Sequence, residues 1–212
     1  MRTKRSLPAV GLAAAALALT GCSSGNEAST VPSGAPGVAS SQPASNGPFN
    51  QADVSFAQKM IPHHAQALAM ASLAAGRTNT PATLELANRI RGEQQPEIDQ
   101  LTGHLTTWGA PVAPTGGAMP GMDHGQGHGS PSGPAMPGMM TEQEMTALRS
   151  LTGAAFDRRW LQMMTSHHQG AIVMAQTELS QGVNPQAKQL ATGIIAAQQA
   201  EIEQMALLHK QS

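Results

Sequence analysis

One helical pattern occurs twice along the 212 residues, and this repeat restricts the fold more than any other feature of the chain. In each copy an aromatic residue and a methionine precede two adjacent histidines at helical spacing, and another methionine lies about two turns further on. His63 and His167 stand at the same place in the pattern, 104 positions apart, and the register between the copies holds without a gap. The two segments are therefore expected to form the same supersecondary unit.

The repeated unit is expected to be a helical hairpin, because a turn-forming segment divides each copy into two stretches with helical apolar periodicity. In the first copy residues 76–79 interrupt the pattern, and Thr80 then precedes Pro81 as an N-cap precedes proline at the first helical position. Asn184 and Pro185 repeat that arrangement in the second copy. One hairpin cannot bury its apolar face alone. The sequence thus predicts an all-α four-helix bundle with pseudo-two-fold symmetry, in which one hairpin packs on the other.

Residues 1–21 have the composition of an export signal. Positive charges near the start are followed by an apolar run that is too short for a comfortable membrane span, and then by Leu19, Thr20, Gly21 and Cys22. This order is typical of a bacterial lipoprotein signal in which Cys22 is lipidated, and an ordinary signal peptide with an incidental cysteine is the alternative. Because Cys22 is the only cysteine, the domain must fold without an internal disulfide. We expect an exported protein anchored by lipid at the extracytoplasmic face of the cell membrane.

Composition divides the remaining chain into four segments. Residues 22–50 are rich in Ser, Gly, Pro and Ala and predict a flexible tether, because they cannot bury enough apolar surface to fold. Residues 51–108 are the first hairpin repeat. Residues 109–140 are rich in Met, His, Gly and Pro without periodicity, which predicts a loop without fixed structure. Residues 141–212 begin with a capping box that predicts a short helix, and then contain the second hairpin repeat.

The charge of the chain limits its partners. Removal of the signal peptide leaves nine Lys and Arg against thirteen Asp and Glu, a net charge of −4. This mild acidity, without a basic stripe, argues against a nucleic-acid partner. The expected partners are a metal ion and, through the N-terminal lipid, a membrane, and the sequence names no protein partner.

The residue types within the repeat indicate a soft-metal site on the helices. At helical spacing one histidine of each pair points inward with the methionines, and the other points toward a neighbouring helix. Methionine as core filler beside hydrogen-bonded histidines is the alternative, but several buried imidazoles need partners, which a metal would supply. Thioethers beside imidazoles favour copper, most of all Cu(I), with silver as a mimic and zinc as the first competitor. The candidate ligands are His63, His64, His167, His168, Met60, Met70, Met163, Met164 and Met174.

The segment between the hairpins supplies a second set of soft donors. Methionine in a polar linker gains nothing from packing, so a soft-metal role explains these residues better than a low-complexity linker does. The candidates are Met119, Met122, His124, His128, Met136, Met139 and Met140.

Two carboxylates occupy matching positions on the second helix of each hairpin. For Glu97 and Glu201, a place on a solvated helix face and a ligand role are equally compatible with the sequence. A di-metal oxidase on a four-helix bundle would require Glu-x-x-His motifs. No glutamate stands three residues before any of the four paired histidines, which disfavours an enzyme of that type.

The second copy contains aromatic, histidine, methionine and acidic residues in a recognisable order: Phe156, Asp157, Trp160, Leu161, Met164, His167, His168, Gln169, Gly170, Ala171, Met174, Ala175, Gln198, Glu201, Ile202 and Met205. This order resembles the signature of a bacterial exported family catalogued as domain of unknown function 305, and the first copy is similar but less complete. The resemblance covers about residues 51–209 without the central loop. It implies a ferritin-like helical fold, domains that occur singly or in tandem, and the histidine pairs with their flanking methionines as copper ligands.

Together these features predict a membrane-anchored, extracytoplasmic copper-binding protein that sequesters or hands on Cu(I) in copper tolerance or homeostasis. A metal-free helical interaction module of the cell envelope is the first alternative. A ferritin-like di-metal oxidase is the second.

Overall fold

The computed structural model of the chain describes residues 47–112 and 136–210. Several sequence predictions lie outside these residues. They are the signal peptide, lipidation at Cys22, the tether predicted for residues 22–50 except its last four residues, and the loop donors Met119, Met122, His124 and His128.

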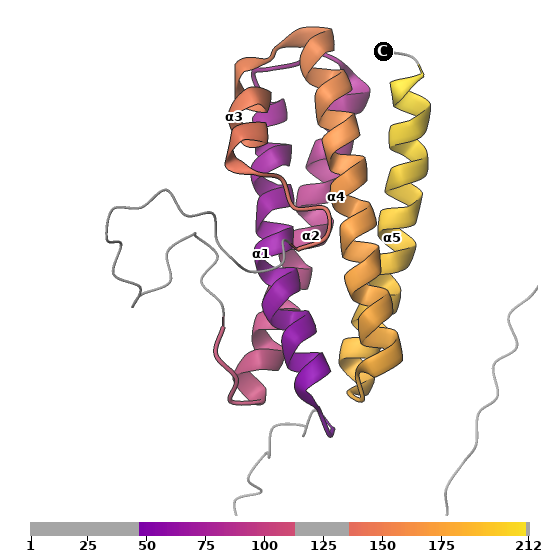
Figure 1. Cartoon of the computed structure of the whole chain (residues 1–212). Coiled ribbons are helices and arrows are strands. Elements are labelled where there is room, and N and C mark those ends of the chain that lie inside the picture. Colours follow the sequence, from indigo (N-terminus) through magenta and orange to yellow (C-terminus); the bar gives the residue numbers. More distant parts are fainter. Residues whose placement is uncertain (1–46, 113–135, 211–212) are drawn as a thin grey trace, which may run out of the picture. The chain divides into compact units, whose positions relative to one another are not determined.

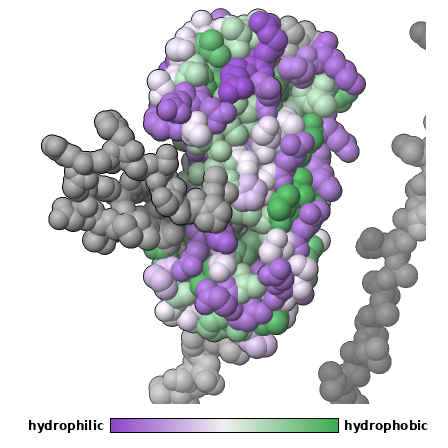
Figure 2. All heavy atoms as spheres, in the orientation of Figure 1, coloured by the Kyte–Doolittle hydropathy of each residue, from purple (hydrophilic) through white to green (hydrophobic). Residues whose placement is uncertain are grey.

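The described residues form five helices and no strand, so the all-α prediction is confirmed. Four long helices run side by side, and a short one lies against one end of the bundle (Figure 1). The helices are α1 (Gln51–Ala74), α2 (Pro81–Thr107), α3 (Glu142–Ser150), α4 (Gly153–Gln181) and α5 (Pro185–His209). Among these helices none combines the length and apolar character of a membrane span. On the face shown in Figure 2, hydrophilic residues are spread over the bundle and hydrophobic ones form only small patches.

Local chemistry sets where the helices begin. The side chain of Asn184 accepts a hydrogen bond from the backbone N–H of Ala187, and Pro185 occupies the first position of α5. Thr141 begins α3 with the predicted capping box. Thr80 also precedes its helix as predicted, but its side chain makes no capping hydrogen bond. The hydroxyl of Thr80 is directed to the other hairpin instead.

An aspartate at the start of each hairpin binds the connection of the other hairpin. Asp53 accepts hydrogen bonds from the backbone N–H groups of Val183 (3.1 Å) and Asn184 (2.8 Å), between α4 and α5. Asp157 accepts a hydrogen bond from the hydroxyl of Thr80 (2.7 Å), between α1 and α2. Both aspartates are buried. These two contacts, made by residues at matching positions, hold the hairpins together near both ends of the bundle.

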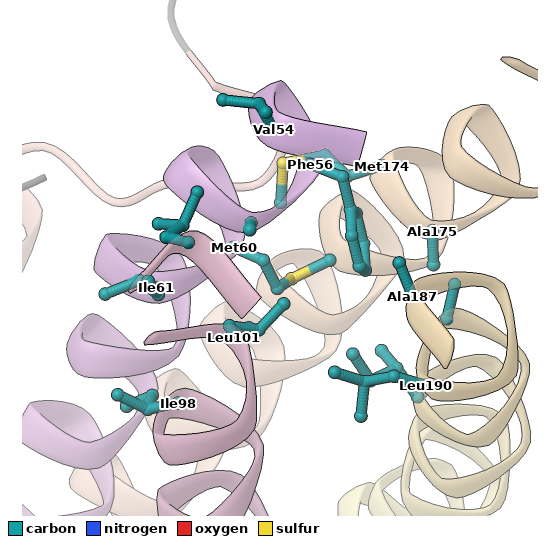
Figure 3. Packing of buried hydrophobic residues seen from close by; sticks show 14 of the residues in the cluster. Val54, Phe56, Met60, Ile61, Ile98, Leu101, Met174, Ala175, Ala187 and Leu190 are labelled. Carbon is teal, nitrogen blue, oxygen red and sulfur yellow. The ribbon is translucent and has the colours of Figure 1, made fainter. Parts of the chain in front are cut away.

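Two apolar clusters fill the interior, one toward each end. The first joins the beginnings of α1 and α5 to the ends of α2 and α4, and Figure 3 shows part of it, with Met60 and Met174 among carbon side chains. The second joins the other halves of the four long helices to α3 and includes Phe156 and Trp160. The indole N–H of Trp160 donates to the carbonyl oxygen of Met70 at 2.9 Å, which ties α4 to α1. Between the clusters lies a layer of buried polar side chains.

Candidate metal centre

The middle of each long helix contributes buried polar side chains to one layer between the apolar clusters. The residues just before and after these positions on α1 and α4 belong to the two clusters, so the layer has apolar packing on both sides. Such a layer is costly unless its polar groups are partnered. Its buried members are His63, His64, Gln94, His167, His168, Gln198 and Glu201.

His63 and His167 meet where the two hairpins are in contact. Their ring centroids are 3.8 Å apart, with the ring planes at 38°. The distance from His63 to His64 is 6.5 Å, and that from His167 to His168 is 6.4 Å, so the two pairs have nearly the same geometry. One imidazole of each pair thus lies at the centre of the bundle, and the other lies toward the second helix of its own hairpin.

The outer histidines are paired with the two glutamates at matching positions. Nε2 of His64 lies 2.7 Å from Oε2 of Glu97, and Nε2 of His168 lies 2.7 Å from Oε2 of Glu201. The side chain of Glu201 is 4 % exposed and that of Glu97 is 16 % exposed, so neither glutamate belongs to a solvated face. The structure thus excludes the solvated helix face for both glutamates, because each turns inward as an acceptor for histidine.

These contacts determine which ring nitrogen of each imidazole is available. A carboxylate or a backbone carbonyl can only accept, so the Nε2 atoms of His64 and His168 donate their hydrogens to Glu97 and Glu201. His63 in the same way donates from Nε2 to the carbonyl oxygen of Pro137, at 3.1 Å. In a neutral imidazole the lone pair is then on Nδ1, and the Nδ1 atoms of all three histidines are buried without a hydrogen-bond partner.

His167 differs from the other three histidines because its ring nitrogens contact neither a glutamate nor the strap, and the acceptor near its ring is the backbone carbonyl of His63. Burial is the main reason that its pKa lies well below the ordinary value of 6.5, and the imidazoles of His63, His168 and His64 lower the pKa further. Burial likewise lowers the pKa of His63 to about 3, with a further contribution from His64. Both central imidazoles are therefore neutral at physiological pH, which is the form that binds metals.

The five methionines predicted as ligands are distributed over both clusters, on either side of the histidine layer. All five are buried. Met60 and Met164 are one helical turn before His63 and His167, so these two lie nearest to the layer in sequence. In the described ranges no three His, Cys, Asp or Glu side chains are arranged to hold a metal ion. A bound ion would thus require movement of these side chains or donation from sulfur. Met60 and Met174 lie in the first cluster, and Met70, Met163 and Met164 in the second.

Part of the predicted central loop packs on the bundle. We call residues 136–140 the strap, which is the orange segment crossing between α1 and α4 in Figure 1. The strap reaches His63 through Pro137, and the amide of Gln66 bonds both the N–H and the carbonyl of Met140, at 2.7 and 2.9 Å. Met136 also borders a cavity of about 650 Å³ with Met174. The loop therefore has a fixed end, which its Gly- and Pro-rich sequence did not indicate.

The fold and this layer define a class of protein: a four-helix bundle with paired imidazoles buried at its centre. Within that class the chain belongs to the family Domain of unknown function (DUF305), which matches residues 53–209. The match spans both hairpins.

Solved structures show the same relationship. A DUF305 protein from Streptomyces coelicolor, named as secreted, is 33% identical over 74% of this chain and 91% of its own, with a TM-score of 0.62. A DUF305 fragment from Deinococcus radiodurans is 30% identical over 78% of this chain and 100% of its own, with a TM-score of 0.65. CopM in a Cu(II)-bound form is 31% identical over 75% of this chain and 96% of its own, with a TM-score of 0.59. CopM has also been solved with Cu(I) and with Ag bound. No curated protein matches the chain.

Proposed function

We propose that this protein binds copper outside the cytoplasm and holds it, as Cu(I), at the histidine layer between its two hairpins. The observation that carries the proposal is the set of buried Nδ1 lone pairs. Three of the four imidazoles donate Nε2–H to a fixed acceptor and leave Nδ1 without a partner. Metal-binding histidines have this arrangement, because the outer acceptor fixes the tautomer and raises the basicity of the ligating nitrogen.

The choice of copper follows from the chemistry around the layer. Imidazole nitrogen suits copper or zinc, whereas thioether sulfur favours Cu(I). Met60 and Met164 are the nearest sulfur donors along their helices, on opposite sides of the layer. CopM, whose bound forms contain copper or silver, supports the same choice. The ligands we propose are the four layer histidines with sulfur from these methionines, and Met70, Met163 and Met174 are the more distant candidates.

The proposal includes a location and a second site. The lipoprotein signal of residues 1–21 and lipidation at Cys22 would anchor the bundle at the extracytoplasmic face, and the secreted relative from Streptomyces coelicolor supports export. The hairpins would be tandem copies of one metal-binding unit. The methionines and histidines of residues 119–140 would form a weaker, loop-borne site that collects metal.

A competition titration with Cu(I) under reducing conditions tests the proposal. Replacement of His63, His64, His167 and His168 by Ala should abolish the tight site, whereas His209→Ala, at the exposed end of α5, should leave it unchanged. Deletion of residues 119–135 should remove only weaker sites and keep the strap. Unchanged Cu(I) affinity and stoichiometry in the fourfold variant would eliminate the layer as the site. A wild-type protein that takes up no copper and gains no thermal stability from it would favour the metal-free interaction module.

A further inference from the structure

At one of the matched positions where the two hairpins differ, the difference determines how the strap binds the bundle. Gly170 on α4 stands where the first repeat has Gln66 on α1. The amide of Gln66 holds the backbone of Met140 by two hydrogen bonds. On α4, a side chain at Gly170 would overlap the carbonyl of Pro137. Gln66 thus binds the strap through its amide, whereas Gly170 leaves room for the strap because it has no side chain.

The contact with α4 is a close approach of two backbones. A Cβ atom on Gly138 would lie 2.5 Å from the carbonyl oxygen of Ser166 and 2.9 Å from that of His167. Gly138 also has a φ of +75°, in the left-handed region that favours glycine. The strap therefore packs on the bundle at one defined position, and this position places the carbonyl of Pro137 next to the ring of His63.

We propose, on the basis of the copper-binding function above, that the strap is a positioning element which orients His63 for metal binding. His64 and His168 receive their acceptors from Glu97 and Glu201, within their own hairpins. His63 faces the other hairpin and has no such glutamate, and the Pro137 carbonyl takes that role. It fixes the hydrogen on Nε2 and directs the Nδ1 lone pair to the interior.

The strap makes the two central histidines unequal. It passes the layer once and contacts His63, so the pseudo-two-fold relation between the hairpins is broken at this point. The ring nitrogens of His167 contact neither the strap nor a glutamate, so within the central pair the strap acts on His63 alone.

Two matched glycine pairs test this role in the full chain. Gly138→Ala should push the strap off α4, and Gly109→Ala is its control, because Gly109 has a similar φ of +64° with no atom near the added Cβ. Gly170→Ala should displace the strap from the helix side, and Gly193→Ala is its control, at a helical glycine with open space. Because alanine favours helix over glycine, Gly170→Ala retains the test if the strap variant folds poorly.

The first measurement is the ring-nitrogen NMR spectrum of His63 without metal. We expect the Nε2–H tautomer in the wild type and both controls, and a mixture of tautomers in the two displaced variants. The second is Cu(I) affinity, expected to fall 10–100-fold when the outer-shell acceptor is lost. An unchanged tautomer or an unchanged affinity in both displaced variants would overturn the role. Tighter binding in them would mean that the strap blocks the site. A wild type that takes up no Cu(I) would instead defeat the copper function, and the positioning role with it.

Discussion

A buried carboxyl group on α4 should make the protein less stable as the pH rises above neutral. Glu178 is 1 % exposed and lies beside Asp53. Burial, followed by the hydrogen bond and charge of Asp53, raises the pKa of Glu178 to about 8 from its ordinary 4.5. Burial also acts to raise the pKa of Asp53, but hydrogen bonds from Glu178 and from the backbone at Asn184, Asn50 and Val183 outweigh it and lower that pKa. Glu178 is therefore the member of the pair that keeps a proton.

The direction of the effect follows from proton counting. Between pH 4.5 and 8 the folded protein keeps a proton on Glu178 that the unfolded chain has lost, so the free energy of unfolding falls as the pH rises. His63, His104 and His167 have the opposite dependence, because burial lowers their pKa values, and their effect fades above the ordinary histidine pKa of 6.5. The interval from pH 7 to 8 therefore reports mainly on Glu178. At about 1.4 kcal/mol per pH unit, stability should fall there by at most about 1 kcal/mol.

Urea unfolding followed by circular dichroism at several pH values between 7 and 8 measures this loss. Glu178→Gln removes the titrating carboxyl group with little change in shape. The fall in the free energy of unfolding with pH should then nearly disappear. Glu203→Gln, at an exposed position on α5, should keep it. The reasoning is refuted if the wild type shows no loss over this interval, or if Glu178→Gln retains the full slope.

Two further predictions concern contacts between helices. Glu201→Ala should lower Cu(I) affinity 10–100-fold in a competition titration, because His168 loses its acceptor. Glu203→Ala is the control and should leave the affinity unchanged. Equal affinities in the two variants would show that Glu201 does not support the metal site. Thr80→Val should lower the free energy of unfolding by about 1–3 kcal/mol in urea, because buried Asp157 loses a donor. Thr106→Val, at an exposed helical threonine, is the control. A loss of stability of the same size there would show that the loss does not depend on the contact with Asp157.

The helices could be predicted because their signals are local. The period of the apolar residues and the proline after Thr80 and Asn184 locate the helices of each hairpin. The match between the copies then indicated how the hairpins pair. The orientation of the paired histidines also followed, because adjacent residues on a helix point about 100° apart.

The parts that escaped prediction depend on contacts between distant segments. Glu97 and Glu201 were visible as a matched pair, but only packing decides whether a carboxylate meets water or histidine. Glu178 has no acidic counterpart in the first copy, where Ala74 stands at the matching position, so comparison of the repeats gave no signal. The strap depends on the missing side chain of Gly170, and an isolated helical glycine has no single meaning in a sequence.

The position of the layer would couple the proposed metal binding to folding. The His64–Glu97 and His168–Glu201 contacts each lie within one hairpin, so either hairpin can form its own pair. The contact between His63 and His167 exists only when the hairpins pack together, because each hairpin contributes one ring. Each buried nitrogen without a partner costs about 1–3 kcal/mol, so the apolar clusters on both sides must offset the layer. An ion that binds the two central rings would remove part of this cost and bridge the hairpins at once. Its binding energy would then add to the stability of the bundle.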